Sequence, residues 1–311
     1  MTATTTSATG QRRAPRMGIG LPVYNAERYL AEAIEAHLAQ SFGDFELLVS
    51  DNGSTDGTWR ICQHYAAKDP RVVGIRHDVN RGLSWNHQFA FENTRGEFFR
   101  WGAADDLPSP GLLQECADLL AADHRLVLVV PDTRNIGEAG EAMGTLERTL
   151  DLRREDVVER TRAILTRGYQ MVFLQGLMRR EAVMATSRRW NYFGWDFILL
   201  LELALLGGLA QTTDAWLNRR LHRDQASRVQ RDLRAGVRKV EPGFGTTILM
   251  PHWRWSFERL RAVLRAPEGI GTRARLAALV ARHTWWSRSA LADDLRANIR
   301  YLTGSRSEAP F

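Results

Sequence analysis

From residue 17 to residue 130 the chain alternates short apolar runs with segments whose apolar residues recur at helical spacing. An apolar run bounded by turn residues is typical of a buried strand, whereas recurrence every three or four residues is typical of an amphipathic helix. Strands that alternate with helices favour a mostly parallel sheet with helices on both faces. The sequence therefore predicts an α/β fold whose ligands bind at the carboxyl ends of strands, where the strand order reverses.

The pattern places five strands and four helices in this region. The strands are expected at residues 17–22, 45–50, 71–76, 98–103 and 126–130, and the helices at 28–40, 58–68, 83–93 and 110–121. After Pro131 we expect a helix near residues 155–166, a strand at 171–178 and an apolar helix at 195–206 that stops at two glycines. Beyond about residue 240 the pattern is helical and basic.

Length and composition limit the class of protein. A chain of 311 residues, 44% hydrophobic and 25% charged, is long enough for one large globular domain or two ordinary ones. The longest apolar run, residues 197–210, is interrupted by Glu202, so no run approaches the roughly 18 residues of a membrane-spanning helix. Residues 1–16 lack the apolar segment of a secretory signal and are expected to be a disordered tail. Cys62 and Cys116 show no disulfide or metal-site spacing, which favours the cytoplasm.

The net charge of +6 is unevenly distributed. Residues 219–311 carry 19 basic and 8 acidic side chains, whereas residues 17–218 carry a net charge of −8. A basic last third favours contact with anionic lipid, an acidic partner or nucleic acid. Nucleic acid is the least favoured of these partners, and we expect none, because no recognised binding motif accompanies the charge.

Loops that follow the first two predicted strands carry groups that a nucleotide needs. The first contains Tyr24, whose ring can stack on a base, beside the N-terminus of a helix. The second, residues 50–58, places carboxylates, an amide and hydroxyls on a turn that contains glycines. Asp51 in this loop can accept a hydrogen bond from a base or a ribose hydroxyl, whereas Asp56 is equally well explained as a helix N-cap.

A third loop, residues 101–108, follows the fourth predicted strand and contains Asp105 next to Asp106. Adjacent carboxylates that leave a buried strand must be neutralised or hold a cation. A hard divalent ion that bridges to a diphosphate would account for them. An acidic pair before a proline is also an ordinary loop ending.

In this order and spacing the three loops resemble those of the family-2 glycosyltransferases of the GT-A fold, over residues 17–222. The resemblance implies a Rossmann-like, mostly parallel sheet with flanking helices, followed here by a C-terminal helical extension. It implies transfer of a sugar from a nucleotide-diphosphate sugar to an acceptor hydroxyl, with inversion, in cell-surface glycan or natural-product glycoside synthesis. The expected divisions are a tail at 1–16, a nucleotide-sugar-binding half at 17–135, an acceptor-binding half at 136–228 and a basic extension at 229–311.

The resemblance also implies which residues bind the donor. Asp51 is expected on the base, and the segment from Asn80 to Asn86 is expected to close over the nucleotide sugar. The bases compatible with this set are uracil, thymine and guanine. The donor-binding residues implied are Pro22, Val23, Tyr24, Asn25, Asp51, Asn52, Ser54, Arg81, Gly82, Asn86, Ala104, Asp105 and Arg220.

A divalent metal, Mg²⁺ or Mn²⁺, is implied as cofactor. Asp105 matches the last position of the family's DxD motif, which holds the metal against the donor diphosphate, and Ala103 stands where many members have the first acidic residue. His222 lies in a segment that resembles the family's closing motif, residues 219–227. It is the expected second metal ligand or, with Arg220, a contact of the departing diphosphate. A lone histidine is also commonly structural.

The acceptor side of the site is implied by the apolar helix at 195–206. Asp196 matches the family's acidic motif and is the expected general base, which removes the proton of the acceptor hydroxyl. The alternative is that Asp196 is a charge favoured by the helix dipole. Glu202 is expected to be a structural acid. The other residues expected on the acceptor side are Asp106, Gln175 and Trp195.

The basic extension leaves two interpretations open. Residues 253–264, 273–282 and 285–301 carry apolar stripes with arginines on the other faces, which suits an anionic membrane surface at the inner face of the cell membrane and a lipid-linked acceptor. The alternative is that the stripes pack on the catalytic domain or across a homodimer interface, with a small-molecule acceptor. A second hypothesis for the whole chain is a catalytically inactive GT-A-like nucleotide-sugar-binding or scaffold protein, because Ala103 replaces an acid.

Overall fold

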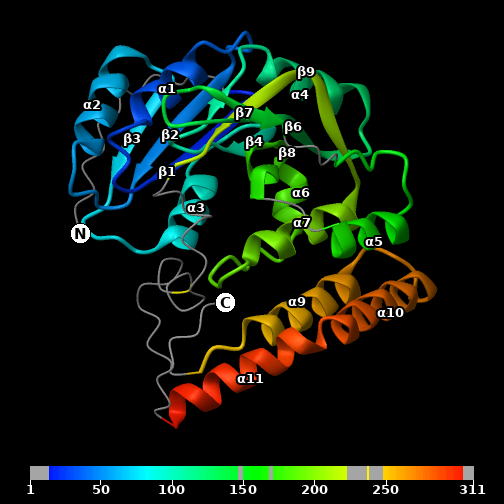
Figure 1. The fold of residues 1–311 in the computed structure, drawn as a ribbon. Helices are drawn as coiled ribbons and strands as arrows, with labels where there is room; N and C mark the ends of the chain where they lie inside the picture. The colour runs from blue at the N-terminus through cyan, green and yellow to red at the C-terminus, as the bar shows by residue number, and fades with distance from the viewer. Residues whose placement is uncertain (1–13, 146–149, 168–170, 223–236, 238–247, 304–311) are drawn as a thin grey trace.

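A nine-stranded sheet forms the centre of the protein (Figure 1). The computed structural model describes residues 14–145, 150–167, 171–222, 237 and 248–303. The strands are β1 (Met17–Val23), β2 (Phe45–Asp51), β3 (Val72–Arg76), β4 (Phe98–Trp101), β5 (Leu107–Pro108), β6 (Leu126–Ile136), β7 (Ala142–Thr145), β8 (Leu177–Arg179) and β9 (Gly208–Arg220). Their order is β3-β2-β1-β4-β8-β6-β9-β5, and β7 pairs with β6.

The sheet has a parallel half that creates the ligand-binding edge. β1 pairs in parallel with β2 and β4, and β2 pairs in parallel with β3. The chain therefore reverses its direction of winding at β1, and the loops after β1, β2 and β4 leave the same edge, as expected for a ligand crevice. In the other half β6 and β9 are parallel, whereas β8, β5 and β7 run antiparallel to their neighbours.

Helices cover both faces of the sheet. The helices of this part are α1 (Leu30–Leu38), α2 (Thr58–Lys68), α3 (Leu83–Glu92), α4 (Leu112–Ala122), α5 (Val157–Arg167), α6 (Arg180–Ala185) and α7 (Trp195–Leu206), with the 3₁₀ helix η1 (Met171–Gln175). One apolar core joins α1, α2 and α4 to one face of the sheet. A second core joins α3, η1 and α7 to the other face. The predicted α/β class is confirmed.

A third apolar core attaches the C-terminal helices α9 (Pro251–Arg265) and α10 (Ile270–Trp286) to the body. Val263 of α9 and Leu276 of α10 are fully buried in it, together with Leu201 of α7 and Val158 of α5. The last helix, α11 (Arg288–Leu302), lies beside α9 (Figure 1). The inner stripes of the basic extension thus pack on α5 and α7 of the α/β body. None of the helices in the described part of the chain combines the length and apolarity that a membrane span requires.

Two of the predicted elements differ most from the structure, and β5, β7, β9 and α6 were not predicted. The strand expected at 171–178 is the 3₁₀ helix η1 followed by the short strand β8, because Val172, Phe173 and Leu174 are all buried and a short apolar run does not distinguish strand from helix. The strand expected at 126–130 continues through Pro131 to Ile136, and the register shifts between Val130 and Asp132, where a proline without an N–H can be accommodated.

The long strand β9 was not predicted, and its polar residues Thr212, Thr213 and Asp214 obscure the apolar alternation. Of the expected N-terminal tail, residues 1–13 lie outside the described residues, and Arg16 pairs with Glu97 at 3.5 Å. Cys62 and Cys116 are free and buried, in α2 and α4.

Candidate functional site

Hydrogen bonds join the loop after β1 to the loop after β2. Asn25, which has a φ of 48°, donates its backbone N–H to Ser54 Oγ (2.9 Å) and accepts the N–H of Thr55 at its side-chain oxygen (2.9 Å). Asp56 accepts the backbone N–H of Thr58 (3.0 Å), the first residue of α2, but the N-cap position of this helix is occupied by Gly57 and not by Asp56. Tyr24, at the same edge, is 47% exposed, and its ring is accessible to a ligand.

Asp51 ends β2 and is completely buried. One carboxylate oxygen accepts the backbone N–H of Ser54 at 3.0 Å, and the other has no hydrogen-bond partner in the described structure. The nearest cation is Arg76, whose Nε lies 3.6 Å from that second oxygen. Since buried polar atoms normally have partners, this oxygen marks a place where a ligand can donate a hydrogen bond.

The segment from Asn80 to Asn86 is fixed by two buried amides. Asn52 donates to the side-chain oxygen of Asn80 (2.9 Å) and accepts the backbone N–H of Arg81 (3.0 Å). Asn86 donates to the backbone carbonyl of Ser50 at 2.9 Å. These amides therefore position the loop, while Arg81 is exposed, with its guanidinium 4.7 Å from the centre of the Trp85 ring. Gly82 has a φ of 93°, a conformation that favours glycine.

The loop after β4 brings Asp105 to His222. The imidazole Nε2 lies 2.8 Å from Asp105 Oδ2, and the other ring nitrogen, which is buried, has no partner in the described structure. No group of three or more His, Cys, Asp or Glu that could hold a metal ion occurs within the described ranges. A carboxylate and an imidazole are both metal ligands, so this pair fits a divalent ion whose other ligands come from a diphosphate and water. The remaining residues of the closing motif, 223–227, lie outside the described residues.

Arg220 is buried and held by the protein. Its guanidinium donates to Glu32 Oε2 of α1 (2.6 Å) and to the carbonyl oxygens of Asp105 (3.2 Å) and Glu138 (2.9 Å). It lies 4.7 Å from the centre of the Tyr29 ring. In this arrangement Arg220 ties the loop after β4 to α1.

Asp106, the next residue of the same loop, is buried. It accepts hydrogen bonds from the Gln175 side chain (2.5 Å) and from the backbone N–H of Arg220 (2.9 Å). Burial, and next the charge of Asp105, raise the pKa of Asp106 to about 7. Asp106 and Gln175, both expected on the acceptor side, thus contact each other.

A buried arginine lies in β4, the strand that leads to the loop with Asp105 and Asp106, which we call the acidic loop. Arg100 of β4 is 1% exposed, and none of its three guanidinium nitrogens has a hydrogen-bond partner in the described structure. Burial lowers its pKa to about 10, while the charge of Asp106 opposes this shift, so Arg100 stays cationic at neutral pH. Nearby His37 stays neutral because burial, and next Arg100, lower its pKa to about 3. The cation offsets part of the negative charge of the acidic loop.

Asp196 lies in the first turn of α7 and is 3% exposed. One of its carboxylate oxygens has no hydrogen-bond partner among the described residues. Burial raises the pKa of Asp196 to about 6, although its own N–H and that of Phe197 act in the opposite direction. A carboxylate with this pKa is mostly ionised at neutral pH and is a stronger base than an exposed one.

Trp195 lies in the core behind Asp196. It is 2% exposed, and its ring centre lies 5.8 Å from that of Trp101 and 5.3 Å from that of Trp190. A ring so enclosed offers no face to an acceptor in this structure. The aromatic cluster instead connects the end of β4 to the start of α7.

The loop before Asp196 depends on a glycine. Gly194 has a φ of 81°, and a Cβ at this position would clash with Nε1 of Trp255 of α9, which donates to the carbonyl of Phe193 (2.7 Å). We expect Gly194→Ala to lower the free energy of unfolding by about 2 kcal/mol or more, from backbone strain and overpacking. Chemical denaturation measures this change. The matched control is Gly111→Ala, before α4, where φ is −90° and the nearest atom is 3.9 Å away; an equal loss in the control would contradict the assignment.

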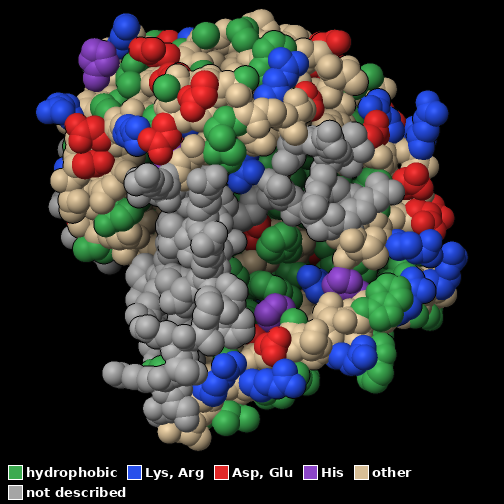
Figure 2. Space-filling view, in the orientation of Figure 1, with side chains coloured by type: hydrophobic (Ala, Val, Ile, Leu, Met, Phe, Trp, Pro, Cys, Tyr) green, Lys and Arg blue, Asp and Glu red, His purple; other side chains and the backbone are tan. Residues whose placement is uncertain are grey.

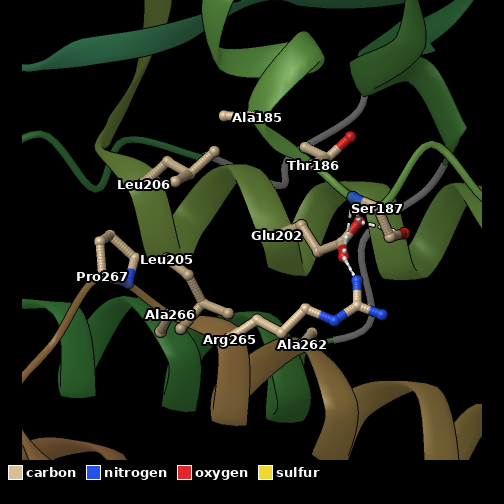
Figure 3. A pocket seen from close by; sticks show the side chains of 10 residues that line it. All are labelled: Ala185, Thr186, Ser187, Glu202, Leu205, Leu206, Ala262, Arg265, Ala266 and Pro267. Carbon is tan, nitrogen blue, oxygen red and sulfur yellow. Dashed lines mark hydrogen bonds and ion pairs between the residues drawn. The ribbon is translucent and has the colours of Figure 1, made fainter.

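Glu202 behaves as a structural acid. It accepts hydrogen bonds from the N–H (3.2 Å) and the hydroxyl (2.9 Å) of Ser187, and Arg265 of α9 lies 4.0 Å away (Figure 3). These residues and Pro267 line a small pocket between α7 and α9. The pocket lies at the junction between the body and the C-terminal helices.

Sequence reasoning missed Arg76, Arg100 and Glu32. Arg76 is the last residue of β3, at the ligand-binding edge, and its position at a predicted strand end could have identified it as a candidate site residue. Arg100 is the one charged residue within the four residues of β4. No sequence pattern indicated a role for Glu32, because its contact with Arg220 joins residues that are far apart in the chain.

Comparison with known proteins supports the same family. The family model described as "Glycosyl transferase family 2" matches residues 19–184. The chondroitin synthase of Escherichia coli is 27% identical over 225 residues, which is 70% of this chain and 30% of that protein. The hyaluronan synthase of Pasteurella multocida is 23% identical over 215 residues, 69% of this chain and 21% of that protein. The matched region thus spans less than a third of either relative.

Solved structures share the fold. S. aureus TarS in complex with UDP-GlcNAc has a TM-score of 0.61 at 14% identity, over 92% of this chain and 81% of that chain. The mannosyltransferase PcManGT from Pyrobaculum calidifontis, in complex with GDP-Man and Mn²⁺, has a TM-score of 0.53 at 15% identity, over 98% of this chain and 79% of that chain. These likenesses confirm the predicted GT-A fold. Because the family match covers more than half of its residues, the chain belongs to glycosyl transferase family 2, a family of glycosyltransferases.

Proposed function

We propose that this glycosyltransferase moves a sugar from a nucleoside-diphosphate sugar to an acceptor hydroxyl, with inversion. The observation that carries the proposal is the placement of Asp51 and Asp105 after β2 and β4, the two neighbours of β1. Two strand spacings amount to roughly 10 Å. One carboxylate can therefore bind the base while the other faces the diphosphate, with the ribose across the end of β1.

Uracil is the base that we propose. The unpartnered oxygen of Asp51 can accept the N–H of the base, and Arg76, 3.6 Å from it, can donate to an adjacent carbonyl oxygen. An N–H beside a carbonyl occurs in uracil, in thymine and in guanine. Of the two fold neighbours compared above, the one with the higher TM-score is a complex with UDP-GlcNAc and the other is a complex with GDP-Man, which favours uracil.

Divalent metal assistance is part of the proposal. Asp105 and His222 would hold Mg²⁺ or Mn²⁺, which would supply positive charge to the leaving diphosphate. Asp196 would remove the proton of the acceptor hydroxyl, and Arg100 would keep the acidic loop from repelling the donor. The lack of an acid at position 103 is offset in this scheme by the imidazole of His222.

Donor binding tests the proposal. We expect UDP to raise the melting temperature, and Mn²⁺ to increase the shift, because ligands that bind only the folded state stabilise it. Asp51→Ala should weaken UDP binding about 10- to 100-fold, since it removes a hydrogen bond to a charged group. Calorimetric titration measures this, with Asp118→Ala on the exposed surface of α4 as the control. A larger effect of GDP or TDP would replace uracil as the base, and unchanged affinity in Asp51→Ala would remove Asp51 from the base site.

A second candidate function is nucleotide-sugar binding without catalysis. The observation that favours it is Ala103, because the acidic loop then supplies fewer metal ligands than many family members have. Tight UDP-sugar binding without sugar transfer or donor hydrolysis, with Mn²⁺ present and across glycan and small-molecule acceptors, would support this function and contradict the proposed transfer.

A further inference from the structure

The outer face of α9 is apolar. Its inner face is buried in the third core, through Ala262 and Val263. On the opposite side four large side chains recur at intervals of four, three and four residues, which places them on one stripe. They are Trp253, Phe257, Leu260 and Leu264, exposed by 46%, 58%, 38% and 52%.

The apolar surface continues on the other two C-terminal helices. The indole of Trp253 donates to the carbonyl of Leu291 of α11 (3.1 Å), so the α9 stripe adjoins α11. Contiguous apolar surface of this kind on a folded protein marks an interaction site. Five of the exposed large residues of α10 and α11, between 45% and 66% exposed, are Trp285, Trp286, Leu295, Ile299 and Leu302. Together with the four α9 residues we call them the outer face.

Arginines border the outer face. Residues 248–303 contain ten arginines and four acidic residues, and two of those acids, Glu258 and Asp294, are buried. Arg282 lies 5.0 Å from the ring centre of Trp286, and Arg288 lies 5.0 Å from that of Trp285. Figure 2 shows basic and hydrophobic side chains next to each other over the C-terminal helices. The outer face is therefore amphipathic and cationic.

We propose that the outer face binds the surface of an anionic lipid bilayer. Exposed tryptophan and aliphatic side chains insert at the boundary between headgroups and acyl chains, while neighbouring arginines contact lipid phosphates. A second copy of the chain is the less favourable occupant, because a two-fold interface brings the same cationic surface against itself.

Binding in this orientation places the candidate base near the membrane. Trp255, on the inner side of α9, donates to the carbonyl of Phe193, three residues before Asp196. The outer stripe lies across the same helix, a distance of about 10 Å. Resting on the proposed transfer reaction, this geometry favours an acceptor presented at the membrane, a lipid-linked glycan, over a small molecule in solution.

Vesicle sedimentation with the full chain tests the inference. We expect the protein to pellet with vesicles of phosphatidylcholine and phosphatidylglycerol, and at least about tenfold less with phosphatidylcholine alone. Trp285→Ser/Trp286→Ser should lower the partition coefficient about tenfold or more, because two rings no longer insert. Met143→Ser, at a 54% exposed methionine of β7, is the matched control. Unchanged melting temperatures verify that the variants fold.

The outcomes separate the possible occupants. Equal pelleting of wild type and double-tryptophan variant, or no pelleting with anionic vesicles, would overturn the inference. A concentration-dependent dimer that the same variant abolishes, without vesicle binding, would assign the outer face to a second copy. Vesicle binding requires no turnover, so failure of sugar transfer in a separate assay with a soluble acceptor would count against the proposed function alone.

Discussion

Asp196→Asn is expected to lower sugar transfer by about 10²- to 10⁴-fold, the contribution typical of a positioned general base. Asparagine has nearly the same shape but cannot take the acceptor proton, so binding of UDP should stay within about threefold of wild type. Transfer at saturating donor and UDP titration measure the two quantities. Transfer unchanged in Asp196→Asn would remove Asp196 as the base.

The same variant has a stability signature. The pKa of Asp196 is raised to about 6 in the folded protein, from an ordinary 3.8, because burial disfavours the charged form. Its stabilising contribution is present below about pH 4 and is lost as the pH rises through 6. Asp196→Asn should therefore be more stable than wild type at pH 8, by about 3 kcal/mol, and nearly equal to it at pH 4. Urea denaturation at both pH values checks this, and a variant less stable than wild type at pH 8 would contradict it.

The rate of sugar transfer by the wild-type protein should depend on the ionisation of Asp196. If Asp196 is the base, kcat/KM rises as the pH increases through about 6 and levels off above it. The limb should be absent from the profile of Asp196→Asn; a limb that persists in this variant would assign it to another group, such as Asp106 with its pKa of about 7.

The second large effect is expected at the acidic loop. Asp105→Asn should lower transfer by about 10²- to 10³-fold, because the proposed metal would no longer be held where it could stabilise the charge on the departing diphosphate. It should also abolish the increase in UDP affinity that Mn²⁺ gives to wild type. Titration of UDP with Mn²⁺ and with a chelator measures this coupling.

Two further variants belong to this titration: His222→Asn tests the second proposed metal ligand, and Asp118→Ala is the control. His222→Asn should reduce the Mn²⁺ effect through loss of the second ligand, while Asp118→Ala, at a surface acid of α4, should preserve it. If chelation and Asp105→Asn both left transfer unchanged, metal assistance would be excluded, and the neutralising charge would have to come from arginines such as Arg81.

Much of the fold could be predicted because local pattern and tertiary packing agree. The bounds of α2 and α7 match the expected 58–68 and 195–206, since each helix begins after glycine-containing loops and carries apolar residues for burial. β9 escaped prediction because the apolar run 197–210 extends across the end of α7 into the new strand. The pattern alone did not reveal where the helix gave way to a strand.

The positions of the candidate site residues in the fold were predictable wherever they depend on strand ends. Asp51 and Asp105 could be placed at one edge because parallel strands end together. The partners of side chains could not be read in the same way. Arg220 was expected on the diphosphate, yet its guanidinium contacts Glu32 from a helix 188 residues earlier, and Asn52 uses its amide on the Asn80 loop. These contacts are set by long-range packing, which local sequence does not encode.

The cluster of Trp101, Trp190 and Trp195 allows changes in the candidate site to be followed by tryptophan fluorescence. Trp101 immediately precedes the acidic loop and Trp195 immediately precedes Asp196, and the two rings are in edge-to-face contact. A shift of either loop alters the packing of both indoles. Intrinsic fluorescence, to which eight further tryptophans also contribute, should therefore change when either loop shifts.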